Sequence, residues 1–230
     1  MEVKGQTALV TGANRGLGRA IAEALVAAGA KKVYATARDP SKIDIPGVVP
    51  IKLDVTNLAD AQAAASRCGD VGIVINNAGI MSAGPALAEA ADGLIRSHME
   101  TNLFSILYVS DAFAPILAKN GGGALVNILS VLSWLTIDGT SAYSASKAAA
   151  WAYTNGIRKE LAAQKTLVTG VHLAYMDTDM TAGLNVPKIT PADVASQILA
   201  GIGQGKTEIL ADDTTRAVKK SFGAETSAYL

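Results

Sequence analysis

The sequence is poor in the residues that form disulfides and bind transition metals. Cys68 is the only cysteine, so no disulfide can form within the chain, and a thiolate metal cluster is excluded. The two histidines, His98 and His172, lie far apart in sequence, and we expect both to be structural. We therefore expect no zinc site and no other metal centre.

Charge is also scarce, and it is balanced. Only 17% of the residues are charged, half are apolar, and twenty Lys plus Arg offset twenty Asp plus Glu. The low charge predicts extensive burial in a two-faced sheet or against other subunits. The neutrality gives no electrostatic reason to expect nucleic acid or an anionic membrane as a partner.

Long apolar runs are absent as well. The apolar run in the N-terminal segment is too short for a signal peptide. No stretch reaches the roughly 18 uninterrupted apolar residues of a membrane span. We therefore expect a soluble, cytoplasmic protein with no membrane partner.

What the chain does have is an alternation of β-branched apolar stretches and helical patterns. The stretches expected to be strands are 7–12, 32–37, 48–55, 71–79, 124–130 and 167–174. The segments expected to be helices are 18–29, 58–68, 94–121, 141–165 and 190–205. This alternation predicts a doubly wound, Rossmann-type parallel sheet in a single α/β domain over residues 1–230. The polar tail, 211–230, is expected to hold one more helix before a loose end.

A glycine-rich turn joins the first predicted strand to the first predicted helix. Gly12, Gly16 and Gly18 let the backbone approach a pyrophosphate, whose charge then lies at the N-terminus of the helix. A plain tight turn is the alternative interpretation, but the position between strand and helix favours dinucleotide binding. The residues of the turn expected to contact the cofactor are Gly12, Asn14, Arg15, Gly16, Leu17 and Gly18.

The end of the second predicted strand indicates which dinucleotide is preferred. A carboxylate here usually holds the ribose hydroxyls of NAD(H), whereas this chain has Ala37 followed by Arg38. Arg38 and Arg15 favour the 2′-phosphate of NADP(H), although Asp39 leaves NAD(H) possible. The alternative for Arg38 is an ordinary solvated surface arginine.

Tyr143 and Lys147 lie one helical turn apart on the same face of a predicted helix. A free phenol has a pKa of about 10. An ammonium roughly 5 Å from the phenol oxygen, at an effective dielectric near 20, favours the phenolate by about 3 kcal/mol, or roughly two pKa units. The pair therefore predicts a tyrosine that acts as an acid and base near neutral pH, and a mere surface neighbourhood is the weaker alternative.

Taken together, these motifs resemble the short-chain dehydrogenase/reductase family, in its shorter branch. The resemblance covers about residues 5–180. It is carried by Gly12-x3-Gly16-x-Gly18, "NNAG" at 76–79, Asn102, Ser130 before Tyr143, and Tyr143-x3-Lys147. It implies a seven-stranded sheet and a catalytic tetrad of Asn102, Ser130, Tyr143 and Lys147.

The resemblance also implies roles for individual residues. Tyr143 would donate the proton, Ser130 would steady the substrate oxygen, Lys147 would also hold the nicotinamide ribose, and Asn102 would anchor a water relay. Further cofactor contacts are implied for Asp54, Val55, Asn77, Ala78, Gly79 and Thr178. Plainer roles stay open: Ser130 as a cap, with Ser133 the weaker catalytic candidate, Asn102 as a satisfied polar residue, and Asp54 as a turn residue.

The chain departs from the family pattern after the sixth predicted strand, where Ala174 and Tyr175 replace the usual Pro-Gly. Tyr175 is bulkier than glycine and is expected to line or narrow the substrate pocket. The following substrate loop, 175–190, is short, which indicates an open cleft for bulky or varied ketones. The candidate wall residues are Met81, Leu132, Trp134, Tyr175, Met180 and Leu184.

The sequence therefore predicts an NADP(H)-dependent ketoreductase or alcohol dehydrogenase that interconverts a ketone and a secondary alcohol. An enoyl reductase is less favoured because that branch spaces its tyrosine and lysine further apart, and a sugar epimerase usually needs a longer chain. A non-catalytic dinucleotide-binding regulator or scaffold is the alternative from another class, but such proteins typically lose the Tyr/Lys pair. The small apolar face at 148–157 predicts a homodimer or homotetramer.

Overall fold

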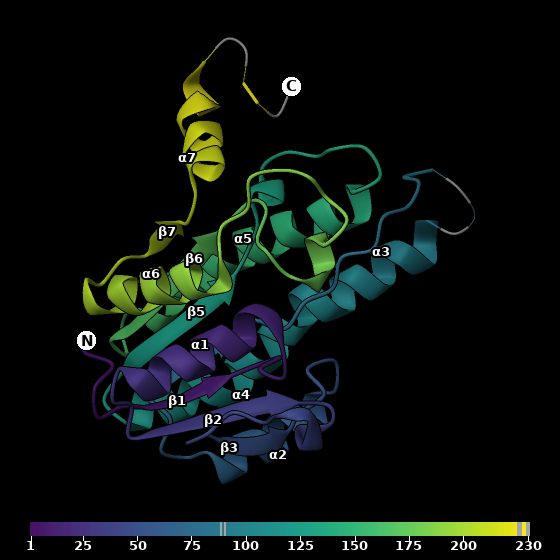
Figure 1. Ribbon diagram of the computed structural model, residues 1–230. Coiled ribbons are helices and arrows are strands. Elements are labelled where there is room, and N and C mark those ends of the chain that lie inside the picture. Colours follow the sequence, from purple (N-terminus) through teal and green to yellow (C-terminus); the bar gives the residue numbers. More distant parts are fainter. Residues whose placement is uncertain (88, 90, 225–226, 229–230) are drawn as a thin grey trace.

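The computed structural model describes residues 1–87, 89, 91–224 and 227–228. In this part of the chain, seven parallel strands form one sheet in the order β3-β2-β1-β4-β5-β6-β7 (Figure 1). The strands are β1 Thr7–Val10, β2 Lys32–Ala37, β3 Val49–Lys52, β4 Ile73–Asn76, β5 Gly123–Ile128, β6 Thr166–His172 and β7 Glu208–Leu210. The predicted seven-stranded α/β sheet is confirmed.

Helices cover both faces of this sheet, as expected for a doubly wound fold. One face carries α1 Gly16–Ala27 and α6 Pro191–Gly203, which pack on each other. The other face carries α2 Leu58–Arg67, α4 Ser105–Lys119 and α5 Ser141–Leu161. Two further helices are α3 Ala91–Met99, which leads into α4, and α7 Asp213–Lys220, which stands at the β7 edge (Figure 1).

The central strands are largely apolar and buried because successive residues pack into two separate cores. Ala8 and Val10 of β1 face α1 and α6, whereas Leu9 between them faces α2 and α4. All three side chains are fully buried. This two-sided burial accounts for the lack of polar alternation in the sequence.

Polar side chains mark where the helices begin. Thr190 caps α6 by accepting a hydrogen bond from the Asp193 backbone N–H, with Pro191 at the first helical position. Asn57 caps α2 by accepting from Ala59 N and Asp60 N. The predicted start at Thr190 is confirmed.

The single helix expected over 94–121 is interrupted. A π-helical turn, Glu100–Phe104, separates α3 from α4 and contains the buried Asn102. A π-turn inserts one extra residue, so it rotates the side chains on either side relative to a regular helix. Local sequence pattern does not encode this insertion, because the flanking segments are both helical.

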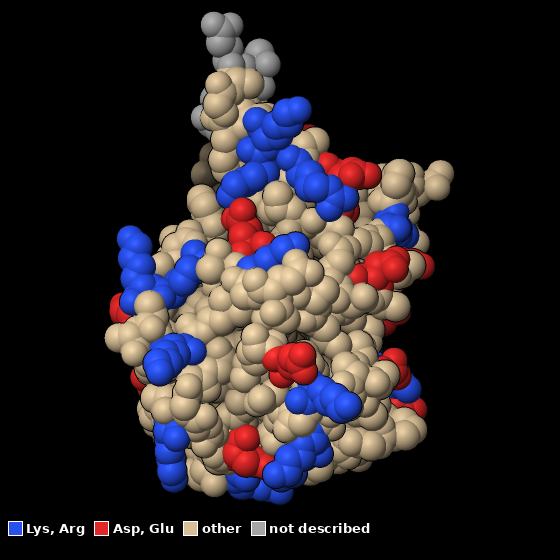
Figure 2. Space-filling view, turned by 90° about the vertical axis from the view of Figure 1, so that its left-hand side faces the viewer, with Lys and Arg blue, Asp and Glu red and all other residues tan. Residues whose placement is uncertain are grey.

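Taken as one run, Ala91–Lys119 is long and apolar enough to cross a membrane by length and composition, and among the described residues it is the one such helix. Its C-terminal half nevertheless packs against β4, β5 and α2, with Phe113 and Leu117 fully buried. Figure 2 shows basic and acidic side chains interspersed with wide uncharged areas on the face it displays. The run therefore carries no argument for a membrane partner.

The C-terminal segment is folded back onto the domain. Thr215 of α7 is fully buried, and Lys219 donates a hydrogen bond to Glu208 Oε1 in β7 at 2.9 Å. A short 3₁₀ turn, Ser221–Gly223, follows α7. The extra helix predicted in the tail 211–230 is therefore present, and residues 225–226 and 229–230 of that prediction lie outside the described residues.

Candidate active site

The glycine-rich turn and the "NNAG" segment meet where the sheet changes its direction of winding. β1 pairs with β2 on one side and with β4 on the other, so the loops after β1 and β4 are neighbours. The Thr11 hydroxyl accepts hydrogen bonds from the backbone N–H groups of Asn77, at 2.9 Å, and Ala78, at 3.0 Å. Asn77 Nδ2 donates to Thr11 O at 2.9 Å. Sequence analysis missed Thr11, which ties the two loops together.

The glycines of the turn leave no room for side chains. Gly12 and Gly16 have φ of +65° and +54°. A Cβ on Gly18 would lie 2.2 Å from Gly12 O and 2.5 Å from Asn77 Nδ2. Leu17 is buried in the core beside α1, so only its backbone faces the turn.

This cradle fits the pyrophosphate of a dinucleotide. α1 begins at Gly16, its N-cap residue Arg15 makes no side-chain capping bond, and no acidic residue lies in the first turn. Side chains therefore leave the first N–H groups of the helix uncapped, and these groups favour a bound anion. Asn14 is half-buried beside them.

At the end of β2, the one carboxylate that left NAD(H) possible is otherwise engaged. Asp39 Oδ1 accepts hydrogen bonds from Ser41 Oγ at 2.6 Å and Ser41 N at 3.1 Å, which caps the short turn Pro40–Lys42. These bonds hold the pKa of Asp39 below its usual value. Arg38 is exposed, and Ala37 is buried.

Arg15 reaches across the mouth of this cradle. Its Nη1 lies 3.2 Å from Asp179 Oδ2 in the substrate loop, and both side chains are exposed. Thr178, the residue before Asp179, lies against the glycine turn, since a Cβ on Gly16 would be 3.6 Å from its Cγ2. The structure thus brings Arg15 and Thr178 to the same edge as the glycines.

Asp54 has a structural role in addition to any contact with a cofactor. Its Oδ1 accepts from Thr56 Oγ1 at 2.8 Å and from Thr56 N at 3.0 Å, which shapes the turn after β3. Burial raises the pKa of Asp54, but the bonds from Thr56 outweigh it and leave the pKa lowered. Val55 beside it is buried in the α2 core.

Lys147 is a buried cation at the carboxyl ends of β4 and β5. The side chain is 5% exposed, and Nζ donates to Ile128 O, the last residue of β5, at 2.8 Å. A Cβ on Gly79, after β4, would lie 3.7 Å from Nζ and 3.1 Å from Asn102 Oδ1. Gly79 therefore lies between Lys147 and Asn102. Burial lowers the pKa of Lys147 to about 8.

Tyr143 lies beside both Lys147 and Ser130. Lys147 Nζ is 5.8 Å from the centroid of the Tyr143 ring, and the Ser130 hydroxyl is near enough to the phenol to lower its pKa. Ser130 Oγ also accepts from Leu132 N at 3.1 Å, so its own proton is free to donate. The three predicted residues are thus brought together.

The predicted lowering of the Tyr143 pKa by Lys147 is wrong. Burial raises the pKa of Tyr143 to about 12, and the hydrogen bond with Ser130 opposes that rise. The reason is that burial disfavours the phenolate, and that Lys147, with a pKa of about 8, has already lost its charge at the pH where Tyr143 ionises.

Asn102 faces the same place from the π-turn. Its Oδ1 accepts from Ile80 N at 2.9 Å, and its Nδ2 donates to Ile80 O at 3.0 Å and to Ser146 Oγ at 2.9 Å. All its visible bonds fix the loop after "NNAG" to α5, so it is both a satisfied polar residue and a neighbour of Lys147. Ser146, which links the two, was not predicted.

Ser130 and Ser133 form a capping box for the short turn Val131–Ser133. Ser130 N donates to Ser133 Oγ at 3.3 Å, so Ser133 holds the backbone of Ser130. The capping role considered for Ser130 is present together with its bond to Tyr143. Ser133 is occupied in this support.

The substitution of Ala174 for the family's proline has a visible consequence. Ala174 N donates to Asp212 Oδ2 at 2.7 Å, a bond that proline lacks the N–H to make. Asp212 also caps α7. Tyr175 O accepts from Ile189 N at 3.0 Å, which ties the two ends of the substrate loop 175–190 together.

The six candidate wall residues differ in their exposure to solvent. Met180 and Leu184 are exposed in the substrate loop, and Met81, Leu132 and Tyr175 are half-buried. Trp134 is 9% exposed and stacks on His172, with ring centroids 4.0 Å apart. The prediction that Trp134 lines the substrate pocket is not supported, because its ring lies in an aromatic cluster with His172, Trp151 and Phe222.

His98 packs against Tyr143 and holds the loop after "NNAG", in keeping with the expected structural role. It is fully buried, its Nε2 accepts from Ser82 N at 3.0 Å, and its Nδ1 lies 2.8 Å from Leu94 O. These partners require a neutral ring with the proton on Nδ1. The ring packs edge-on to Tyr143, at 6.1 Å between centroids.

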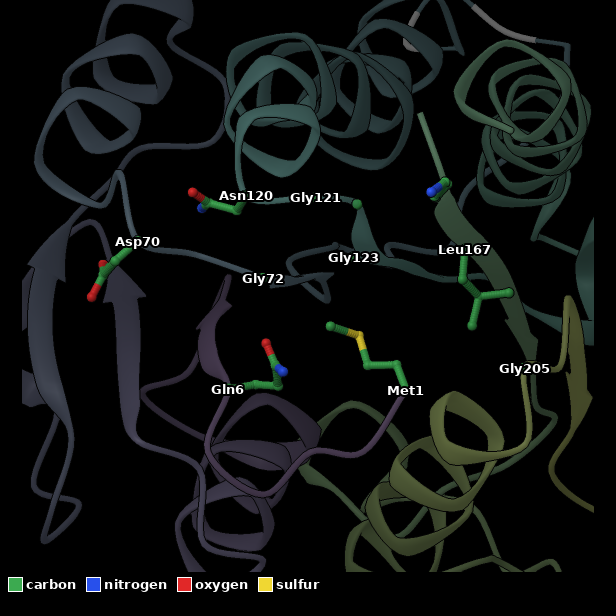
Figure 3. Close-up of a pocket in the computed structure, with 11 residues that line it drawn as sticks. Met1, Gln6, Asp70, Gly72, Asn120, Gly121, Gly123, Leu167 and Gly205 are labelled. Atoms are coloured by element: carbon green, nitrogen blue, oxygen red, sulfur yellow. The ribbon is translucent and has the colours of Figure 1, made fainter. Parts of the chain in front are cut away.

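A hollow of about 400 Å³ lies at the amino ends of the strands, at the end of the sheet opposite to the glycine-rich turn. Figure 3 shows Met1 and Gln6, which precede β1, and Leu167 of β6 around it, together with Gly72 before β4 and Gly123 at the start of β5. Ligands of doubly wound sheets bind at the carboxyl ends of the strands, whereas this hollow lies at the amino ends. It holds none of the predicted site residues.

Comparison with known proteins agrees with this geometry. Residues 6–188 match the family model described as short chain dehydrogenase. An uncharacterized oxidoreductase of Staphylococcus aureus is 33% identical, covering 93% of this chain and 97% of the relative. The 3-oxoacyl-[acyl-carrier-protein] reductase of Salmonella typhimurium is 32% identical, over 91% of this chain and 88% of the relative.

A solved structure shares both the fold and part of the sequence. It is a short chain dehydrogenase from Burkholderia cenocepacia in complex with NADP, with a TM-score of 0.93 and 37% identity over 98% of this chain and 95% of the other. The chain therefore belongs to the short-chain dehydrogenase/reductase family of oxidoreductases.

Proposed function

We propose that the protein is an NADP(H)-dependent oxidoreductase that interconverts ketones and the corresponding secondary alcohols. The observation that carries the proposal is the convergence of Tyr143, Ser130 and Lys147 beside the glycine cradle. A related protein named as a 3-oxoacyl reductase supports a ketone as the substrate class. The presence of the complete Tyr/Lys/Ser set argues against a non-catalytic regulator.

The raised pKa of Tyr143 suits reduction. A bound NADPH would supply a hydride to the carbonyl carbon of the ketone. Tyr143 is protonated at neutral pH, and it donates its proton to the substrate oxygen as negative charge grows there. Ser130, whose hydroxyl proton is free, donates a hydrogen bond to the same oxygen.

Lys147 holds a positive charge next to this oxygen. One of its three N–H donors is taken by Ile128 O, which leaves two for the nicotinamide ribose and for polarising Tyr143. In the oxidation direction the roles reverse, and Tyr143 must first lose its proton.

The preference for NADP(H) rests on Arg15 and Arg38. Both guanidinium groups lie at exposed positions by the cradle, and Asp39 is engaged with Ser41. The NADP in the similar Burkholderia structure supports the same cofactor here. NAD(H) as a second cofactor, and a cytoplasmic location, remain predictions.

Association of copies belongs to the same proposal, and Ala152 and Gly156 of the face first predicted are exposed. Within 148–157, Ala150 and Ile157 are buried inside the chain, and Trp151 packs against Trp134. Phe104, 39% exposed, stacks with Tyr108 and offers an alternative apolar contact. We expect sedimentation at micromolar concentration to give a dimer or tetramer, and a monomeric mass contradicts this part of the proposal.

Replacing Tyr143 by Phe tests the chemistry. The substitution removes the proton donor but keeps the ring, so ketone reduction should fall by about 10²- to 10⁴-fold. NADPH binding, measured by fluorescence, should stay within about twofold of wild type, since the cradle is untouched. Undiminished turnover in this variant rules out the proposed mechanism.

The pH dependence should report Lys147. Its pKa of about 8 means that the ammonium is charged below pH 8 and loses its proton as pH rises through that value. Because Tyr143 keeps its proton up to about pH 12, the kcat/KM for ketone reduction should be level below pH 8 and fall about tenfold per unit above it. A profile that stays level to pH 10 contradicts the assignment.

Replacing Arg15 or Arg38 by alanine should lower activity with NADPH more than activity with NADH. Charge-assisted hydrogen bonds contribute about 1.5–3 kcal/mol. Arg15→Ala or Arg38→Ala should therefore lower kcat/KM with NADPH by about tenfold or more. NADH, which lacks the 2′-phosphate, is the matched control and should change less than about twofold. Equal losses with both cofactors mean that the arginines do not read the phosphate.

A further inference from the structure

His172 holds the backbone of Ser130. It is the last residue of β6 and 1% exposed, and its Nδ1 lies 3.1 Å from Ser130 O. A carbonyl oxygen only accepts, so Nδ1 carries the proton and donates it. On either side, Leu129 N bonds to Val171 O and Val131 N to Leu173 O as an ordinary strand ladder. Ser130 O also accepts from Ser133 N at 3.0 Å within its own turn, so His172 is its second donor and the one that ties this turn to β6.

An aromatic cluster fixes the orientation of this imidazole. The Trp134 ring stacks on His172 with centroids 4.0 Å apart and planes 23° apart. Trp151 meets both rings edge-on, at 6.1 Å from Trp134 and 6.5 Å from His172. These contacts hold the plane of the imidazole, and the hydrogen bond to Ser130 O determines that the edge with Nδ1 faces Ser130.

The C-terminal segment closes the cluster from outside. Lys219 Nζ lies 4.9 Å from the centroid of Trp134, within the range of a cation–π contact, and Phe222 meets the same ring edge-on at 5.4 Å. Lys219 is held there by its 2.9 Å hydrogen bond to Glu208. Lys219 and Phe222 therefore pack against Trp134, which in turn packs against His172.

Burial keeps His172 neutral. Glu208 Oε1 is 3.9 Å from Nε2, while Lys219 and Lys147 are the neighbouring cations. Burial is the main cause that lowers the pKa of His172 to about 4, and the bond to Ser130 O and the charge of Glu208 oppose it. The ring is therefore a neutral hydrogen-bond donor over the working range of pH.

We propose that His172 is a positioning residue, whose Nδ1–H fixes the Ser130 carbonyl and thereby aims the Ser130 hydroxyl at the reacting oxygen. Trp134 and the segment 219–222 hold it in place. The inference rests on the proposed function, because it concerns how Ser130 serves that reaction. It gives the C-terminal segment a part in catalysis without any contact to substrate.

Two substitutions at His172 form a matched pair. Asn can place its Nδ2 donor where Nδ1 lies, whereas Leu has a similar size and no donor. His172→Leu should lower kcat for ketone reduction about tenfold, with the Kd for NADPH within about twofold of wild type. His172→Asn should recover most of the lost kcat. Wild-type kcat in the Leu variant, or an Asn variant no better than Leu, overturns the inference.

Nitrogen NMR of the wild-type imidazoles tests the hydrogen bond without relying on a variant's folding. The chain has two histidines, and both should appear as neutral Nδ1–H tautomers at pH 7. A His172 ring with its proton on Nε2 overturns the inference. Lys219→Met, at a partly exposed position, should lower kcat about two- to threefold with unchanged NADPH binding, and no change in kcat argues against the clamp.

These outcomes separate the inference from the proposed function. If the wild-type protein reduces no ketone with NADPH, the proposed function fails, and the positioning role fails with it. If the wild type is active and Tyr143→Phe is not, while His172→Leu keeps full kcat, only the positioning role is lost.

Discussion

The site depends on keeping one ammonium buried at the carboxyl ends of the central strands. Taking a charge out of water costs several kcal/mol, so a buried lysine needs a strong partner. Lys147 has it in the Ile128 carbonyl, which exists in that place because β5 ends there and α5 crosses above it. The same helix then sets Tyr143 one turn away. One hydrogen bond thus places the ammonium at the end of β5, and one helical turn places the phenol beside it.

The surroundings shift the two ionisable groups in ways that suit reduction. Burial lowers the pKa of Lys147 to about 8 and raises that of Tyr143 to about 12, so the tyrosine keeps a proton to give. The hydrogen bond from Ser130 partly offsets the second effect. Ser130 in turn depends on β6 and on the C-terminal segment, through His172 and Trp134. The position of Ser130 therefore depends on residues of β6 and of the C-terminal segment.

Features with a local cause could be predicted from the sequence, and features with a distant cause could not. The β2 strand falls at the predicted residues 32–37, and the glycine turn lies between strand and helix as expected, because both follow from local pattern. The three-residue β7 was not located, since so short a strand has no pattern of its own. The place of Trp134 was missed because Phe222, far along the chain, helps to cover it. The predicted pKa of Tyr143 was wrong because the prediction counted the charge of Lys147 and left out the burial of the phenol.

The buried ammonium can be observed directly. In protein with ¹³C-labelled lysine, the Cε resonance of each lysine moves when its amine loses a proton. The structure predicts one lysine that titrates at about pH 8, and that resonance should be missing from Lys147→Met. If no lysine titrates below about pH 9.5, Lys147 is not buried as described, and the account of the site fails.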